Sequence, residues 1–222
     1  LAVVVMAGLA GWFAAGYTGT IVPVWANLLL LVLIYLTVYA TSMIYASLKT
    51  VARWHHPLTP VCYLMFAAAG GLLAVLAMLA LLGLPITAAL AQAGIVLMLS
   101  AWGVKLAWWR LAGMARHAGS VESATGLGHL GTVKPLMPPH TEENYLQHEM
   151  GFVVARKHAD KLRIFAIGLG GVLPIIVLLV APASAAALGF AVLSHVAGMF
   201  FERWLFFAEA KHVVTLYYEG AT

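Results

Sequence analysis

The sequence predicts an all-α protein, a polytopic bundle of transmembrane helices, and three observations support this prediction. Hydrophobic residues make up 63% of the 222 residues and charged residues only 9%, whereas a soluble domain carries roughly 25% charged residues. Several apolar stretches reach the length of about 20 residues that crosses a bilayer. The charged residues gather in alternate connections between these stretches. We therefore expect a single membrane domain over residues 1–222.

The apolar stretches predict six spans. They run over residues 1–17, 24–48, 61–82, 86–109, 162–180 and 185–207. Pro174 is expected to kink the fifth span, because proline removes a backbone donor from the helix interior. The first span looks clipped, and no basic segment precedes it, so we expect further sequence upstream rather than a signal peptide.

The distribution of charge predicts the orientation of the bundle. The connections 18–23, 83–85 and 181–184 contain no charged residue. With six alternating crossings, all twelve Lys and Arg and all eight acidic residues fall on the other side. The positive-inside rule makes that side cytoplasmic. A soluble partner is therefore expected to dock on the charged, cytoplasmic face.

The segment 112–161 is the one long hydrophilic element between the predicted spans. Its first half is rich in Gly and Pro and is typical of an irregular loop. From Thr141, a good N-cap residue, the pattern predicts an interfacial amphipathic helix. About 50 residues is long for an idle connection, so partner docking through Arg156 and Lys157 is one interpretation, and a solvated linker is the other.

The stretch 42–57, SMIYASLKTVARWHHP, is where the second span leaves the membrane. If the helix continues through it, steps of three and four residues place its hydroxyl and cationic side chains near one face. Those side chains are Ser42, Tyr45, Lys49 and Arg53. The adjacent His55 and His56 are a weak metal signal, because neighbours on a helix face different ways, and we assign both to partner docking with Arg53.

Ionisable residues inside spans need a reason, because burying a charge in the bilayer is costly. Lys105 can reach the interface by snorkelling, or it can donate to a buried anion or carbonyl. Glu202 can pair with neighbouring helices or deliver protons, and Arg203 is expected to point away from it. His195 lies deeper and fits a hydrogen-bonded packing role better than haem ligation, which needs a second deep histidine.

The composition narrows the possible chemistry. The sequence has one cysteine, which excludes an intramolecular disulfide and an iron–sulfur cluster housed by this chain alone. No hydrolase triad, P-loop or HExxH motif is evident, so we expect neither a complete enzyme nor a metal or haem site. A quinone fits an amphipathic slot with aromatic walls and polar donors. The expected quinone or proton-path residues are Tyr45, Lys49, Lys105, Glu202 and Arg203. A small transporter or channel and a purely structural anchor are the alternatives.

Four runs of sequence resemble the membrane anchor subunits of the dimethyl sulfoxide reductase type, and most closely the branch that anchors sulfite-oxidising molybdoenzymes. They are ATSMIYASLKTVARWHHPLTPVCYL from Ala40, ESATGLGHLG from Glu122, PPHTEENYLQHEMGFVVARKHADKLR from Pro138 and FERWLFFAEAKHVVTLYY from Phe201.

The resemblance implies a heterotrimer in a bacterial inner membrane. A molybdopterin subunit would oxidise the substrate, a ferredoxin-like iron–sulfur subunit would pass electrons, and the anchor would bind ubiquinone or menaquinone. Family members have eight spans, so the resemblance implies two more upstream. The family's His-Leu-Gly-x-Pro turn and the Arg-Glu after it are absent here, and those residues are not carried over. The resulting hypothesis is a quinone-binding anchor of a sulfite:quinone oxidoreductase.

Overall fold

The computed structural model describes residues 16, 23–114, 122, 125–133 and 157–210. Within these residues the regular elements are all helical: α2 (Val24–Ala46), α3 (Leu58–Leu81), α4 (Ala88–Gly113), α8 (Ala159–Ile167), the π-helical turn η1 (Gly168–Val172), α9 (Leu173–Val180) and α10 (Ala185–Ala208). The expected all-helical class is thus confirmed for the described part of the chain.

In the described part of the chain, five helices are long and apolar enough to cross a membrane, and α8, η1 and α9 together form one of them. They correspond to the second through sixth predicted spans, with shifted ends. The first predicted span, 1–17, lies outside the described residues except for Gly16. The predicted amphipathic helix from Thr141 and the docking residue Arg156 also lie outside them.

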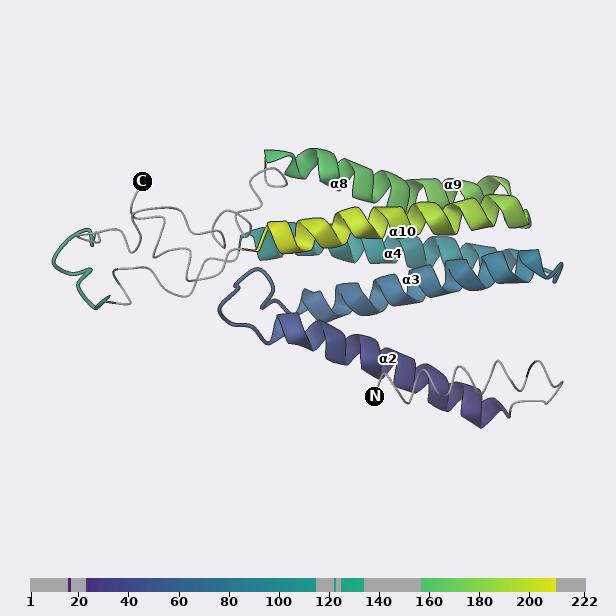
Figure 1. Cartoon of the computed structure of the whole chain (residues 1–222), viewed down its shortest axis with the longest axis horizontal. Coiled ribbons are helices and arrows are strands. Elements are labelled where there is room, and N and C mark those ends of the chain that lie inside the picture. Colours follow the sequence, from purple (N-terminus) through teal and green to yellow (C-terminus); the bar gives the residue numbers. More distant parts are fainter. Residues whose placement is uncertain (1–15, 17–22, 115–121, 123–124, 134–156, 211–222) are drawn as a thin grey trace.

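Helices α3, α4, α8–α9 and α10 pack side by side, and α2 lies at the edge of this group, chiefly against α3 (Figure 1). Apolar residues fill the space between the helices, and the large ones with less than 2% exposure include Leu73, Met98, Trp108, Leu188 and Phe206. Most of the α2 surface is exposed in the chain alone. Helix α2 therefore positions residues at its end rather than forming the core.

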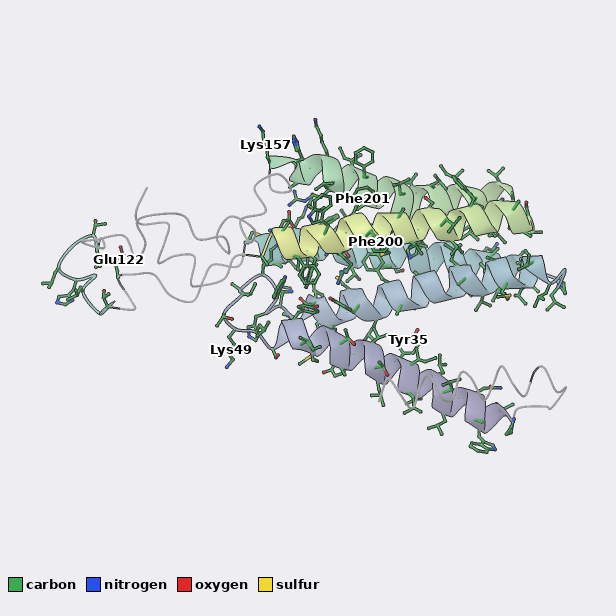
Figure 2. All side chains as sticks on the ribbon, in the orientation of Figure 1. Tyr35, Lys49, Glu122, Lys157, Phe200 and Phe201 are labelled. Carbon is green, nitrogen blue, oxygen red and sulfur yellow. The ribbon has the colours of Figure 1, made fainter. Side chains whose placement is uncertain are left out.

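The charged residues that the structure describes lie toward one end of the bundle. Helices α2, α4 and α10 end there and α3 and α8 begin there, while the uncharged connections 83–85 and 181–184 lie at the other end (Figure 1). Lys49, Glu122 and Lys157 stand at this charged end (Figure 2). The expected one-sided distribution of charge therefore holds for the described residues.

The predicted continuation of the second span through residues 42–57 is wrong. Helix α2 ends at Ala46, and turns lead to Pro57, the N-cap of α3. Two histidines bind the helix ends: His55 Nδ1 lies 2.6 Å from the Ala46 carbonyl oxygen, and the Leu58 N–H donates to His56 Nδ1 at 3.2 Å. These side chains satisfy backbone groups that helix termini leave unpaired. Ser42, Tyr45, Lys49 and Arg53 consequently do not share a helix face.

The fifth span contains a π-helical turn immediately before Pro174. In an α-helix the Gly170 carbonyl would accept from residue 174, and proline has no N–H to donate. Helix α10 supplies other partners: His195 Nδ1 lies 2.6 Å from the Gly170 oxygen, and the Ser194 hydroxyl donates to the Leu169 oxygen at 2.7 Å. The expected hydrogen-bonded packing role of His195 is therefore confirmed. The irregularity that accompanies Pro174 in the fifth span is a π-helical turn.

Candidate functional site

The first ionic group at the charged end joins Lys105 of α4 to Glu202 and Arg203 of α10. Lys105 Nζ pairs with Glu202 Oε1, and Arg203 Nε donates to Glu202 Oε2. The side chains of Lys105, Glu202 and Arg203 are 1%, 0% and 28% exposed. We call these residues the inner triad. One carboxylate against two cations leaves it with a surplus of one positive charge.

The inner triad corrects two predictions and confirms a third. Lys105 does not snorkel to the interface, because its ammonium group is buried against Glu202. Arg203 was expected to point away from Glu202, yet its guanidinium group folds back along α10 to reach the carboxylate. Glu202 pairs with a neighbouring helix, as one of its two interpretations predicted.

Aromatic rings surround the cations of the inner triad. Lys105 Nζ lies 3.8 Å from the centroid of the Trp108 ring and 5.6 Å from that of Phe206. Arg203 Cζ lies 4.4 Å from the centroid of Tyr63 and 4.7 Å from that of Phe206. At these distances the ring faces attract a cation, and more strongly where water is excluded. The triad thus combines ion pairs with apolar walls.

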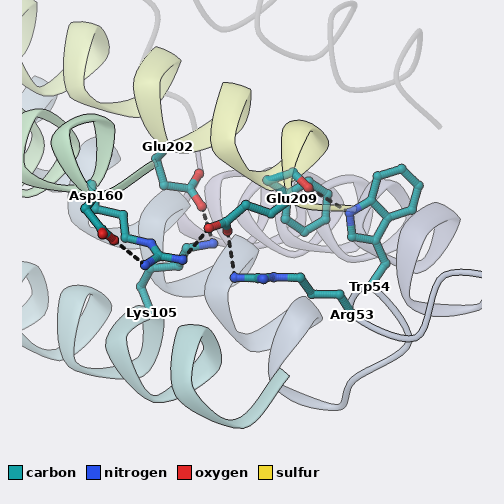
Figure 3. Close-up of polar contacts among 8 residues, drawn as sticks. Arg53, Trp54, Lys105, Asp160, Glu202 and Glu209 are labelled. Carbon is teal, nitrogen blue, oxygen red and sulfur yellow. Dashed lines mark hydrogen bonds and ion pairs between the residues drawn. The ribbon is translucent and has the colours of Figure 1, made fainter. Parts of the chain in front are cut away.

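A second ionic group lies closer to the aqueous end. The Glu209 carboxylate accepts from Arg53 Nη2 at 2.6 Å and from Arg163 Nη2, and Arg163 Nη1 donates to Asp160 at 2.8 Å (Figure 3). We call Arg53, Asp160, Arg163 and Glu209 the outer cluster. Burial lowers the pKa of the Arg53 guanidinium from its usual value, although Glu209 opposes this shift. The outer cluster ties the connection after α2, helix α8 and the end of α10 together.

Three hydrogen bonds connect the helices between these ionic groups. The Trp108 indole N–H donates to Thr59 Oγ1, and the Thr59 hydroxyl donates to the Trp54 carbonyl oxygen, each at 2.9 Å. The Trp54 indole N–H donates to the Phe206 carbonyl oxygen, also at 2.9 Å (Figure 3). The chain of bonds runs through the 47–57 connection, α3, α4 and α10, and fixes their relative positions.

The remaining predicted site residues lie in different environments. Tyr45 packs against the aromatic cluster, with its ring centroid 5.3 Å from that of Phe206 and 6.1 Å from that of Tyr63. Lys49 is exposed in the turn after α2 (Figure 2) and is not among the ion-pair partners of the inner triad. Lys157 is exposed just before α8. Lys49 therefore does not line a slot with the other predicted residues.

Sequence reasoning missed several residues of the site, namely Thr59, Tyr63, Trp108, Arg163 and Glu209 as ionic or hydrogen-bonding partners. The spacing of Glu202, Phe206 and Glu209 places them on one face of a helix, and this spacing is the signal that could have found Glu209. No local pattern links Thr59 to Trp108, because their contact depends on how α3 packs against α4.

Hydrogen-bond donors exceed acceptors around the two ionic groups. Among the described residues, the buried side-chain donors that have no hydrogen-bond partner are Arg53 Nε, Trp102 Nε1, Trp109 Nε1, Arg163 Nε and Arg203 Nη1. Buried polar groups usually have partners, so each exception needs an explanation. Of the inner triad, Arg203 is the residue that remains partly exposed. The arrangement suits a ligand that presents acceptor oxygens to Arg203.

The chain is similar to a curated protein from the bacterium Allochromatium vinosum, which is named as the C subunit of sulfite dehydrogenase. The two are 29% identical over 184 residues, which is 81% of this chain and 56% of the relative. This chain thus spans about half the length of the relative. No family model matches the chain, and no solved structure matches it.

Proposed function

We propose that this chain is a membrane subunit of a sulfite-oxidising complex and that it binds a quinone near its charged end. The similarity to the sulfite dehydrogenase C subunit supports the assignment to such a complex. The observation that carries the quinone proposal is the inner triad, with its surplus positive charge, its aromatic walls and its buried unpaired donor. Ionic groups buried among membrane-spanning helices are costly and commonly mark a functional site.

A quinone fits the residues that are present. Its two carbonyl oxygens accept hydrogen bonds, and Arg203 Nη1 is a buried donor without a partner. The Tyr63 ring lies against Arg203 and the Tyr45 ring lies beside Tyr63, so a flat headgroup would meet aromatic surfaces. The quinone, when bound, accepts electrons and protons.

Each residue of the inner triad has a distinct task in this proposal. Arg203 binds the headgroup oxygen, and Glu202 orients the Arg203 guanidinium through its Nε. Lys105 supplies the second positive charge and fixes the other oxygen of Glu202. Tyr45 and Tyr63 exclude water from one side. Tyr63 takes the place that the sequence-based hypothesis gave to Lys49.

The charged end is the docking face for the other subunits in this proposal. Electrons from sulfite would arrive through an iron–sulfur subunit that is itself joined to a molybdopterin subunit. Arg53, His55 and His56 lie in the connection between α2 and α3, and Lys157 lies before α8, so all four stand at this end. Arg156 belongs to the same proposed surface by its position in the sequence, and the surface would face the cytoplasm.

The test is purification of the full-length protein in mild detergent with the subunits that accompany it. We expect molybdenum and iron to co-purify, and a quinone analogue to bind saturably to the complex. Arg203→Met should weaken analogue binding about tenfold or more, because a charge-assisted hydrogen bond is lost. Arg110→Met removes an exposed cation from the end of α4 and should leave binding unchanged.

The alternative functions predict other results. A purely structural anchor would yield the metal-containing complex, but analogue binding would be absent or insensitive to Arg203→Met. A transporter or channel would be isolated as a lone, metal-free protein. Either result would overturn the corresponding half of the proposal.

A further inference from the structure

The Trp108 and Trp109 rings lie between the inner triad and the outer cluster, and Trp108 makes the shorter contacts with both. The Trp108 ring lies 3.8 Å from Lys105 Nζ and 5.4 Å from Arg53 Cζ, measured to the ring centroid. Its side chain is fully buried, and Phe206 lies beside it with a centroid distance of 5.5 Å. The outer cluster reaches water through Asp160, which is 90% exposed. Trp108 is therefore a wall between an aqueous end and a buried ionic group.

The orientation of this wall depends on one hydroxyl group. The Trp108 N–H donates to Thr59 Oγ1, and Thr59 is 1% exposed at the start of α3. The Thr59 hydroxyl in turn donates a hydrogen bond to the Trp54 carbonyl oxygen. If the hydroxyl were removed, the buried Trp108 N–H would be left unpaired, whereas the Trp54 carbonyl oxygen would keep its 2.8 Å hydrogen bond from the His56 N–H. An unpaired buried donor gains by turning toward water, which here lies on the outer side.

We propose that Thr59 is a positioning residue of the site: it holds the Trp108 ring over the Lys105 ammonium group and so keeps water away from the inner triad. The inference rests on the proposed function only in taking the inner triad as the ligand site. The wall itself can be tested without a ligand. In this inference Thr59 acts through Trp108, whose N–H it accepts.

Cys62 provides a built-in reporter for this wall. It lies one turn after Thr59 on α3, it is 2% exposed, and it is close enough to Lys105, Glu202 and Arg203 to interact with them electrostatically. A water-soluble, charged thiol reagent reaches Cys62 only when water does. Its labelling rate, read from the Cys62 peptide by mass spectrometry, therefore measures access to the inner triad.

The experiment compares Thr59→Val with Thr59→Ser in the full-length protein together with its accompanying subunits. Valine keeps the shape of threonine without the hydroxyl, and we expect Cys62 to be labelled roughly tenfold faster. Serine keeps the hydroxyl and should restore the original rate. Trp108→Phe keeps an aromatic ring without the N–H and should behave like Thr59→Val. These two variants remove the same hydrogen bond from opposite sides.

Ser194→Ala is the matched control. It also removes a buried hydroxyl-to-carbonyl hydrogen bond, of 2.7 Å, but between α10 and η1. Its Cys62 labelling rate should stay at the original value. Unchanged labelling in Thr59→Val, an equal rise in Ser194→Ala, or failure of Thr59→Ser to restore the rate would overturn the inference.

Binding of a quinone analogue separates this inference from the proposed function. If both are correct, Thr59→Val increases Cys62 labelling and weakens analogue binding, and Thr59→Ser restores both. Faster labelling with unchanged binding would support the wall and contradict the inner triad as the quinone site. Weaker binding without faster labelling would contradict the wall alone.

Discussion

At the scale of single residues, the site is defined by an imbalance of charge. The inner triad holds two cations and one carboxylate in a place where Lys105 and Glu202 are almost completely buried. A buried charge that loses its partner is strongly destabilising. The three residues therefore do not contribute equally to stability. The cost of substituting each one depends on the net charge that remains in the inner triad.

Glu202→Gln should be far more damaging than Lys105→Met. The glutamine variant leaves two buried cations without a counter-charge, and we expect a loss of about 3–5 kcal/mol in the free energy of unfolding. The methionine variant leaves a neutral pair of Glu202 and Arg203, and it should cost less than about 2 kcal/mol. Thermal and denaturant unfolding in detergent measure both values. Equal losses would contradict the charge argument.

The cap that His56 provides at the start of α3 should be sensitive to acid. Burial lowers the pKa of His56 from its ordinary value of 6.5, and its Nδ1 accepts from Leu58 N–H only while the imidazole is neutral. The unfolded chain therefore takes up this proton first, and the stabilisation is present above about pH 6.5 and lost as the pH falls through the lower folded-state pKa.

His56→Asn tests this dependence, because an asparagine side-chain oxygen can accept the same N–H without titrating. We expect the variant to lose part of the acid sensitivity of the unfolding temperature between pH 7.5 and pH 5. An unchanged pH profile in His56→Asn would show that the cap does not depend on the neutral imidazole.

At the scale of elements, the π-helical turn sets how closely two spans approach. A Cβ atom added to Gly198 would lie 2.2 Å from the Gly170 backbone nitrogen and 2.3 Å from its Cα. Small residues allow such contacts between membrane helices. The contact holds α10 against η1, and the next turns of α10 carry Glu202 and Arg203 toward α4 and α3.

Gly198→Ala should force α10 away from η1, because the contact is with backbone atoms that cannot rotate aside. Overpacking of this kind costs roughly 1–3 kcal/mol or more, and we expect a clearly lower unfolding temperature. Gly189→Ala on the same helix meets no atom within 4 Å and should be neutral or slightly stabilising. A Gly198→Ala variant as stable as Gly189→Ala would contradict the close packing.

The sequence predicted which stretches form membrane-spanning helices better than it predicted the residues at which those helices begin and end. Apolar length was enough to locate the spans, because a bilayer imposes it. The end of α2 at Ala46, where His55 Nδ1 contacts the Ala46 carbonyl oxygen, and the cap of α3 by His56 were both missed, since neither depends on apolar length. Pro174 indicated an irregular fifth span. His195, which bonds the Gly170 carbonyl oxygen in place of the missing Pro174 N–H, lies on another helix, and the sequence did not predict that contact. The pairing of Lys105 with Glu202 likewise depends on packing between α4 and α10.

At the scale of the whole molecule, the charge distribution and the site belong to the same end of the bundle. Charged connections follow α2 and α4, and the uncharged ones lie opposite (Figure 1). A quinone moves within the bilayer, while the proposed electron-donating subunits are soluble. A site near the charged end is therefore within reach of both, and the proposal requires this end to face the compartment that holds those subunits.

Cysteine labelling of membrane vesicles can establish which compartment this is. Thr50 is exposed in the connection after α2, and Leu84 is 48% exposed at the opposite end. Because Lys and Arg are retained on the cytoplasmic side, Thr50→Cys should react with a membrane-impermeant reagent in inverted vesicles, and Leu84→Cys in right-side-out vesicles. Quantifying each labelled peptide by mass spectrometry keeps other cysteines out of the measurement. The reverse labelling pattern would place the charged end outside the cell. The sulfite-oxidising partners would then have to dock on that side, where the positive-inside rule disfavours a basic surface.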